Sequence, residues 1–330
     1  MWVRFPLAAL GHSPLIYAKI SPMTARLVFM GSPEFSVIIL RHLAEQYPVV
    51  GVVTQPDRPS GRGRAITPPP VRLLADELRL PVIQPERLKE PAAEQQLQDW
   101  QPDLIIVAAF GQILRKSVLE LPPHGCVNVH ASLLPRWRGA APIQAALLHG
   151  DRETGVTIMC MDPGVDTGPT LAQQALPILP DDTAASLSER LSHLGAQLLL
   201  DTLPAYLRGE ITPQPQDETR ATYAPQLKKE DGELDFTQSA ETLERRVRAF
   251  NPWPGAYTHW QGQPLRVLRA HVANPGVVQS PVAMGQRCIN QKQPAIGTSS
   301  GLLVLDEVQP PGKKPMPGKS FLAGIRDWTT

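Results

Sequence analysis

Two polar side chains stand two residues apart in an otherwise apolar run, Cys-Val-Asn-Val-His, near the middle of the chain. Side chains alternate along a strand, so Asn128 and His130 are expected to point to the same face. Both can form directional hydrogen bonds, and a strand end that presents them together is a candidate for binding or catalysis. The alternative is that both side chains bond only to the backbone of the following loop.

From Arg26 onward, short apolar runs alternate with amphipathic segments, a pattern typical of βαβ units and a doubly wound parallel α/β sheet. Such sheets bind ligands beyond the carboxyl ends of their strands. The segments that follow three predicted strands are therefore site candidates, namely 110–114, 130–135 and 162–168. The first glycine-bearing turn, at 30–33, lacks the Gly-x-Gly-x-x-Gly spacing, which disfavours a nicotinamide cofactor.

The elements that must position these residues can be placed along the chain. Strands are predicted at 26–30, 49–54, 104–109, 127–130 and 156–161. Helices are predicted after a capping hydroxyl at Ser32, at 71–80, at 143–149, and from Asp182 or Thr183 onward, where leucines at 187, 191, 194 and 198 share one face. A helix at 239–250 and short β-type runs at 265–272 and 302–308 predict a small β-barrel.

Length and composition favour a two-domain protein that folds in a reducing compartment. The 330 residues suit a domain at 23–209, a polar, proline-interrupted linker at 210–230 and a second domain at 231–330. Lys plus Arg (32) nearly balance Asp plus Glu (31), so nucleic-acid affinity must come from local patches. The three cysteines lack metal-binding or disulfide spacing, and no apolar run has the length of a membrane span, so we expect a cytoplasmic protein.

Residues 1–22 precede the first predicted strand. They contain Arg4 and Lys19 but no acidic residue, as targeting segments do. Met23 stands three residues before that strand, so we expect an extension that is not translated or is disordered. The alternative is a genuine transit peptide, which would place the protein in an organelle.

A long arginine-bearing loop, residues 54–70, separates one predicted strand from the next helix. Arg58, Arg62 and Arg64 are interspersed with glycines, so the backbone can approach an irregular surface while guanidinium groups reach phosphates or bases. A loop of this length without a strand or helix pattern is unusual inside a domain, and such loops are often functional. The alternative is a solvated loop with incidental charge.

Asn128-Val-His130 followed by Ser132-Leu-Leu-Pro135 resembles the active-site signature of the folate-dependent formyltransferases. The continuation at 136–143 is similar to the members of that family that act on methionyl-tRNA. Other matching stretches lie at 54–59, 61–63, 161–168 and 248–254, and together the matches extend from about Leu27 to Lys319. The resemblance implies a Rossmann-like formyltransferase domain followed by an OB-like β-barrel domain.

The same resemblance implies a role for each motif residue. Asn128 and His130 would donate hydrogen bonds to the formyl oxygen as it becomes an oxyanion, and Asp166 would position His130 and move protons through water. Attack of an amine on a formyl carbon builds negative charge on oxygen and positive charge on nitrogen, so donors and a proton acceptor are both needed. Asp162 is the second candidate for the acid, and its alternative is a turn-forming Asp before Pro163.

The implied formyl donor is 10-formyltetrahydrofolate, and no metal is required. The residues implied to hold it are Ser132, Leu133, Leu134 and Pro135, with Phe110, Gly111, Ile113 and Leu114 as an apolar wall.

The implied acceptor is initiator methionyl-tRNA, contacted by Arg58, Arg62 and Arg64, with Arg62 as the wedge into the acceptor end. Where the family's loop often has two lysines after Gly63, this chain has Arg64-Ala65, which leaves the strength of the contact open. Further candidates for phosphate contacts, which are otherwise only solvated charges, are Arg245, Arg246, Arg248, Lys313, Lys314 and Lys319. We expect Trp253 to be a packed anchor and the protein to be a monomer.

Three other functions stay open on the sequence. The same chemistry on a small amine, such as glycinamide ribonucleotide or an amino sugar nucleotide, leaves the arginine loop and the β-barrel unexplained. Hydrolysis of a formyl folate leaves the loop unexplained as well. A non-catalytic tRNA-binding protein would tolerate loss of Asn128, His130 or Asp166, yet all three motif positions are occupied.

Overall fold

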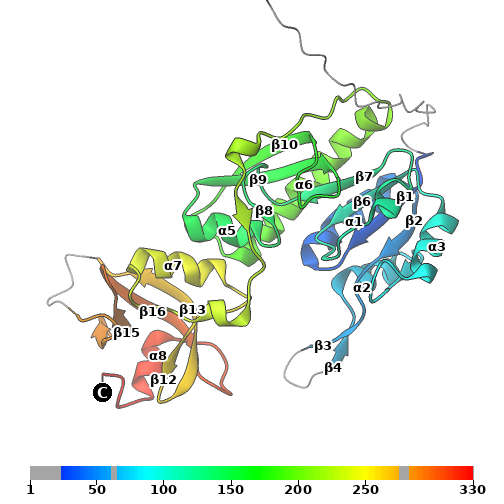
Figure 1. Ribbon diagram of the computed structural model, residues 1–330. Coiled ribbons are helices and arrows are strands. Elements are labelled where there is room, and N and C mark those ends of the chain that lie inside the picture. The colour runs from blue at the N-terminus through cyan, green and yellow to red at the C-terminus, as the bar shows by residue number, and fades with distance from the viewer. Residues whose placement is uncertain (1–23, 61–64, 275–281, 330) are drawn as a thin grey trace, which may run out of the picture.

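The apolar runs of the first half of the chain pair into one seven-stranded sheet, in the order β10-β9-β7-β6-β1-β2-β5 (Figure 1). The computed structural model describes residues 24–60, 65–274 and 282–329. The strands of this sheet are β1 (Leu27–Gly31), β2 (Val49–Val53), β5 (Val82–Ile83), β6 (Leu104–Ala108), β7 (Cys126–His130), β9 (Glu153–Cys160) and β10 (Thr170–Pro177). Strands β5, β2, β1, β6 and β7 run parallel, which confirms the predicted α/β class.

Strand β9 runs antiparallel to β7, so the prediction that the run at 156–161 belongs to the parallel set was wrong. Val127 lies beside Cys160 and His130 lies beside Thr157, so the carboxyl end of β9 lies beside the amino end of β7. An apolar run indicates a buried strand but carries no information on strand direction. That direction depends on the connection, which here contains β8 (Arg138–Gly139) and α5 (Pro142–His149).

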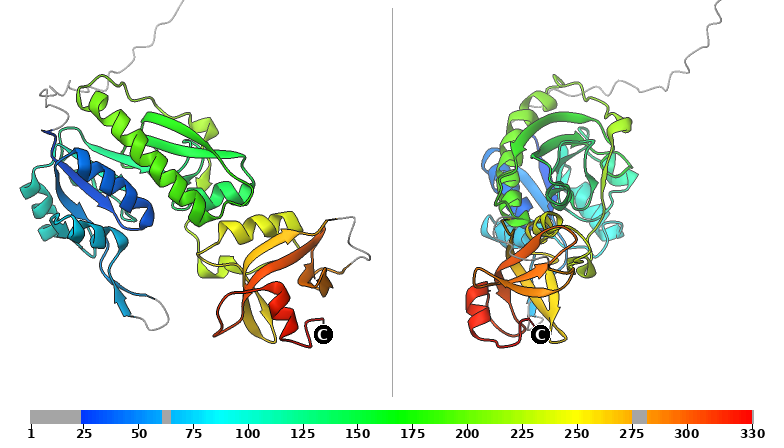
Figure 2. Two further views of the ribbon diagram at one scale, coloured as in Figure 1. Left: turned by 180° about the vertical axis from the view of Figure 1, so that it is seen from behind. Right: turned by 90° about the vertical axis from the view of Figure 1, so that its left-hand side faces the viewer.

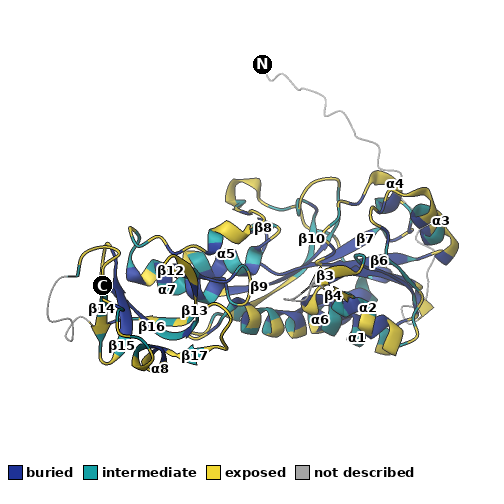
Figure 3. Ribbon diagram, turned by 90° about the horizontal axis from the view of Figure 1, so that it is seen from below, coloured by how far each residue is buried: buried dark blue, intermediate teal, exposed yellow. Residues whose placement is uncertain are grey.

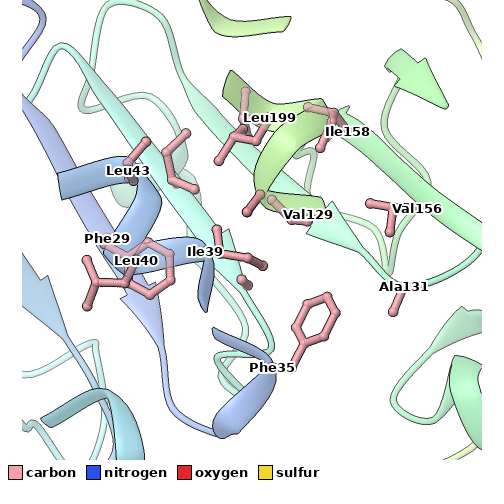
Figure 4. Packing of buried hydrophobic residues seen from close by; sticks show 14 of the residues in the cluster. Phe29, Phe35, Ile39, Leu40, Leu43, Val129, Ala131, Val156, Ile158 and Leu199 are labelled. Carbon is pink, nitrogen blue, oxygen red and sulfur yellow. The ribbon is translucent and has the colours of Figure 1, made fainter. Parts of the chain in front are cut away.

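Helices cover both faces of the sheet. Helices α1 (Glu34–Gln46), α2 (Pro70–Glu77) and α6 (Ala184–Leu207) pack on one face, and α3 (Pro91–Trp100) and α4 (Lys116–Leu119) pack on the other. Figure 3 shows the buried strands between helices whose outer surfaces are exposed. In Figure 4, Leu199 lies against Val129 and Ile158. Because Leu199 is fully buried, truncating it to alanine is expected to cost about 2–5 kcal/mol.

The two predicted helix starts differ in outcome. Thr183 caps α6, and its side chain accepts a hydrogen bond from the Ser186 N–H, as predicted. Ser32 does not cap α1, whose N-terminal cap is Pro33 without a side-chain bond. The Ser32 hydroxyl instead accepts hydrogen bonds from Thr54 Oγ1 at 3.2 Å and from the Gln55 N–H at 3.1 Å. It therefore joins β1 to the end of β2, a long-range contact that local sequence does not indicate.

The C-terminal part of the chain forms an antiparallel sheet of the OB-like type, in the order β12-β13-β16-β15-β14, with β17 paired to β16. Its elements are α7 (Ala240–Ala249), β12 (Tyr257–Trp260), β13 (Gln263–Val272), β14 (Arg287–Asn290), β15 (Gln293–Gly297), β16 (Leu302–Gln309), β17 (Met316–Pro317) and α8 (Gly318–Ala323). Leu243 and Val247 of α7 are buried against Leu265 and Leu303 of the sheet. The predicted helix at 239–250 and the runs at 265–272 and 302–308 are confirmed.

The arginine-bearing loop contains a β-hairpin, so the prediction that it lacks secondary structure was wrong. Its strands, β3 (Arg58–Ser60) and β4 (Ala65–Thr67), have three residues each, too few to give a recognisable alternation. Figures 1 and 2 show this hairpin extending from the first domain toward the side on which the C-terminal domain lies. The predictions for Arg62, Arg64 and the extension 1–22 lie outside the described residues.

The polar segment after α6 does not run free of the first domain. Two short 3-10 helices, Glu218–Arg220 and Lys229–Gly232, lie within it, and β11 (Tyr223–Ala224) pairs in parallel with β8. This pairing places the connection to the C-terminal domain beside the loop that follows β7.

Candidate active site

The structure brings Asn128, His130 and Asp166 together. Asn128 Nδ2 donates to Asp166 Oδ1 at 3.3 Å, and His130 Nδ1 lies 3.6 Å from Asp166 Oδ2. Asn128 and His130 come from one face of β7, as their spacing predicts, and both are buried. The amide of Asn128 has two hydrogens, and the bond to Asp166 uses one of them.

The His130 ring is oriented by main chain on one side and by carboxylate on the other. Its Nε2 lies 2.9 Å from the carbonyl oxygen of Trp137. A carbonyl oxygen can only accept, so Nε2 carries a hydrogen. The Nδ1 atom is left facing Asp166 and is the ring atom available to a ligand. A hydrogen bond from His130 to a substrate oxygen therefore requires the form with hydrogens on both nitrogens.

Asp166 reaches Asn128 and His130 although the carboxyl end of β9 lies beside the amino end of β7. The segment between β9 and β10 folds back over the sheet, and Asp166 adopts a left-handed conformation with φ of 54°. Few residues other than glycine take this conformation, and Asp is among those that tolerate it. The Gly139 N–H, at the end of β8, donates to Asp166 Oδ2 at 2.8 Å. The carboxylate therefore has fixed donors on both oxygens.

A brace from the segment after α6 holds the Asp166 loop in place. Gln216 Nε2 donates to the carbonyl oxygens of Asp166 and Gly168, at 2.8 and 2.7 Å. Its Oε1 accepts from Arg138 Nε and Nη2, at 3.0 and 2.8 Å. Arg138 is fully buried and also pairs with Glu218, with the shortest N–O distance at 2.7 Å. Sequence reasoning assigned no role to Gln216 or Arg138, because Gln216 lies 50 residues from Asp166 in a polar stretch.

A cavity of about 160 Å³ opens beside Asp166. Two of the residues predicted as its apolar wall, Ile113 and Leu114, line it, whereas Phe110 and Gly111 do not. Phe110 packs in the core with α3 and α4, and Gly111 has a positive φ of 79° in the turn after β6. Gln112, Gly164 and Val165 also line it, within the predicted candidate segments 110–114 and 162–168, whereas Met159 and Met161 are lining residues that sequence reasoning missed.

The structure does not bring the predicted folate-binding segment 132–135 to this cavity. Ser132 Oγ donates to the Arg136 carbonyl oxygen at 2.6 Å. The Leu134 N–H donates to Thr157 Oγ1, and its carbonyl oxygen accepts from Gln173 Nε2. These bonds fix the turn that follows His130, and a direct contact of 132–135 with folate stays a prediction.

Asp162 is a turn residue, as its alternative interpretation states. Its Oδ1 accepts from the Gly164 N–H at 3.0 Å and from Thr167 Oγ1 at 2.7 Å. Asp162 lines the cavity but belongs to the turn that carries Asp166 rather than to the Asn128–His130 pair.

The thiol on β7 is not a nucleophile. Cys126 lies on β7 two residues before Asn128, and burial raises the pKa of its thiol to about 12. A thiol with so high a pKa stays protonated and unreactive at neutral pH. Among the described residues, no group of three or more His, Cys, Asp or Glu side chains is placed to hold a metal ion, and no helix is both long and apolar enough to span a membrane.

The arginines of α7 make structural hydrogen bonds, and contacts of these side chains with phosphates stay a prediction. Arg245 Nε donates to the Leu148 carbonyl oxygen, Arg246 to that of Asp231, and Arg248 to that of Asp182. These bonds hold α7 against the first domain and against the segment that precedes it. Periodicity identified the helix but not which polar side chains face an interface.

The other predicted tRNA contacts are on the surface. Arg58 makes one long ion pair, with Glu86 at 3.4 Å between exposed side chains. Lys313, Lys314 and Lys319 are exposed, and no ion pair within the described parts of the chain involves them. Trp253 is 52% exposed at the tip of a turn, so the expectation that it is a packed anchor was wrong.

Comparisons with known proteins agree with this arrangement. Residues 25–203 match the family model for formyl transferase, and residues 226–326 match the model for its C-terminal domain. The methionyl-tRNA formyltransferase of Chloroflexus aurantiacus is 48% identical over 301 residues, which cover 91% of this chain and 97% of the relative. That of Myxococcus xanthus is 50% identical over 303 residues, which cover 91% and 95%.

Solved structures share the fold at low sequence identity. The methionyl-tRNA formyltransferase from Clostridium thermocellum superposes with a TM-score of 0.54 at 18% identity, over 76% of this chain and 95% of that chain. HypX from Aquifex aeolicus, in complex with tetrahydrofolic acid, gives a TM-score of 0.60 at 18% identity, over 91% and 47%. On the family models and the curated relatives, the chain belongs to the formyl transferase family, and within it to the group of methionyl-tRNA formyltransferases.

Proposed function

We propose that this protein transfers the formyl group of 10-formyltetrahydrofolate to the free amino group of methionyl initiator tRNA, for the initiation of translation. The observation that carries the proposal is the meeting of Asn128 and His130 with Asp166, which lines a cavity, in a chain 48–50% identical to methionyl-tRNA formyltransferases along nearly its whole length.

The site supplies what each stage of formyl transfer needs. The amino nitrogen attacks the formyl carbon, a new N–C bond forms, and the carbonyl oxygen becomes an oxyanion. The second hydrogen of Asn128 Nδ2 and a hydrogen on His130 Nδ1 stabilise that oxygen. When the bond from the formyl carbon to N10 of the folate breaks, the proton lost by the amine passes through Asp166 and water to N10.

Two structural features support a tRNA acceptor. The β3–β4 hairpin and the C-terminal domain extend on the same side of the catalytic domain (Figures 1 and 2), so a large acceptor can contact both. We assign the contact with the acceptor end to Arg58, Arg62 and Arg64. We further propose a cytoplasmic monomer, with the domain limits 23–209, 210–230 and 231–330.

The test is direct. The purified protein is incubated with 10-formyltetrahydrofolate and methionyl initiator tRNA, and formyl-methionyl-tRNA is resolved on acid gels. We expect product with this tRNA and none with uncharged tRNA. Formylation of a small amine, such as an amino sugar nucleotide, without formylation of the tRNA would reject the proposal.

A further inference from the structure

A second cavity, of about 150 Å³, lies next to the one beside Asp166. Gln112 and Ile113 line both cavities, and the following two residues diverge, since Leu114 lines the first cavity and Arg115 the second. The two hollows are therefore neighbouring parts of one surface, separated by the short segment after β6.

The second cavity is basic. Arg87, Lys89 and Arg115 line it, against the single acid Glu94. The three basic side chains are exposed, and no ion pair within the parts of the chain that the structure describes involves them. Glu94 accepts a hydrogen bond from Ser117 Oγ at 3.2 Å. Three cations without carboxylate partners around one hollow favour an anionic ligand.

Gln112 and Ile113 form a ridge between the two cavities, which is held in place by hydrogen bonds and is apolar at its top. The Gln112 side chain accepts from the Leu88 N–H at 2.7 Å and donates to the Pro85 carbonyl oxygen at 3.4 Å. Ile113 is 82% exposed, more than any other large hydrophobic side chain among the described residues. An exposed isoleucine on a fixed ridge can contact the flat face of a ring that crosses it.

We propose that Arg87, Lys89 and Arg115 bind the glutamate tail of the folate donor, and that this site makes the enzyme prefer donors with several glutamates. The inference rests on the proposed function. A folate has three parts in sequence, a pterin, an aminobenzoyl ring and a chain of glutamates with one free carboxylate per added unit. The first cavity, the Ile113 ridge and the basic cavity lie in the same order, so they would hold the pterin, the aminobenzoyl ring and the glutamates respectively.

The phosphates of tRNA are the other anion available in this reaction. The observations favour the tail, because the basic hollow is small and shares its wall with the cavity beside Asp166. A phosphate backbone spans a longer surface and is contacted by basic side chains spread along it.

The experiment compares donors carrying one or three glutamates, with methionyl-tRNA held saturating. Each exposed ion pair changes an affinity by about 1.4- to 5-fold, and the triglutamate adds two carboxylates, so its KM is expected to be at least about twofold lower. In the triple variant Arg87→Gln, Lys89→Gln, Arg115→Gln, the two KM values should converge. Raising the salt concentration should reduce the preference of the unmodified protein.

The control removes three exposed charges elsewhere, in the variant Arg152→Gln, Lys229→Gln, Lys292→Gln, which should retain the preference for the triglutamate donor. Equal KM values for both donors in the unmodified protein would overturn the proposal. A triple cavity variant that raises the KM for tRNA but keeps the donor preference would assign these cations to tRNA instead.

Calorimetric titration with mono- and triglutamyl tetrahydrofolate, in the absence of tRNA, separates this inference from the proposed function. Tighter binding of the triglutamate that is lost in the cavity variant supports the tail site even if tRNA is not formylated. Equal affinity for the two ligands contradicts it even if tRNA is formylated.

Discussion

Gln216 holds Asp166 by its main chain, with a hydrogen bond of 2.8 Å from the Gln216 side-chain amide to the Asp166 carbonyl oxygen. The same amide bonds to the Gly168 carbonyl oxygen, and Arg138 fixes the other end of the Gln216 side chain. The segment that leads to the C-terminal domain thus determines the position of the acid at the reacting centre.

Gln216→Ala is expected to lower kcat roughly ten- to a hundred-fold with little change in the KM for either substrate, because displacing a reacting group by about 1 Å can cost a hundred-fold in rate. The matched control is Gln214→Ala, since within the described residues the Gln214 side chain bonds only to the Thr212 carbonyl oxygen nearby. Steady-state kinetics on both variants give the answer. An equal loss in both, or a loss confined to KM, would contradict a positioning role.

Arg138 is expected to matter for stability as well as for catalysis. Arg138→Met leaves Gln216 Oε1 without its two donors, so the free energy of unfolding should fall by about 1–3 kcal/mol. Arg208→Met removes an exposed ion pair with Glu210 and should cost less than about 1 kcal/mol. Chemical denaturation of the two variants tests the difference. Similar losses of unfolding free energy would show that the buried Arg138–Gln216 contact adds nothing to stability.

The buried thiol predicts a pH dependence of stability. The pKa of Cys126 is raised by burial from 9.0 to about 12, so the stabilisation from its neutral form is complete below pH 9 and decreases as pH rises toward 12. The difference in unfolding free energy between the unmodified protein and Cys126→Ala should therefore shrink above pH 9, by up to about 1.4 kcal/mol per pH unit. Denaturation at pH 8, 9 and 10.5 measures it, and a constant difference would contradict the assignment.

The hairpin arginines are expected to act on tRNA binding rather than on chemistry. Arg58→Ala should raise the KM for tRNA. The slope of the logarithm of the tRNA binding constant against the logarithm of the salt concentration should become less steep by about one, since one phosphate contact is lost. Arg62→Ala should have the larger effect if it is the wedge. Arg41→Ala, which removes an exposed pair with Glu77, is the control. Equal salt slopes for Arg58→Ala and Arg41→Ala would leave the hairpin without a role in binding.

Much of the fold could be predicted from the sequence because it depends on local patterns. The strands at β1, β6 and β7 are short apolar runs, and the capped start of α6 has a recognisable hydroxyl at Thr183. The direction of β9 could not be predicted, because a buried run reads the same in both directions. The short strands of the β3–β4 hairpin could not be predicted either, since three residues do not establish the two-residue alternation of a strand.

The site residues also fall into those that local sequence predicts and those that depend on long-range contacts. Asn128 and His130 are two residues apart on one strand, so their shared face follows from alternation alone. Asp166 was assigned by resemblance to a family, and its approach depends on a left-handed turn that folds back over the sheet. Gln216 and Arg138 could not be found, because their importance arises from contacts across about 50 and 80 residues of chain.

The central claim is that Asn128 and Asp166 act on the reacting formyl group rather than on folding or binding. Its most direct test is the single-turnover rate of formyl transfer to methionyl-tRNA by Asn128→Ala and Asp166→Asn, with both substrates saturating and folate affinity measured separately. We predict a roughly hundred- to thousand-fold lower rate for Asn128→Ala with folate affinity nearly unchanged. A rate within a few-fold of the unmodified protein, or a loss explained entirely by weaker folate binding, would contradict it.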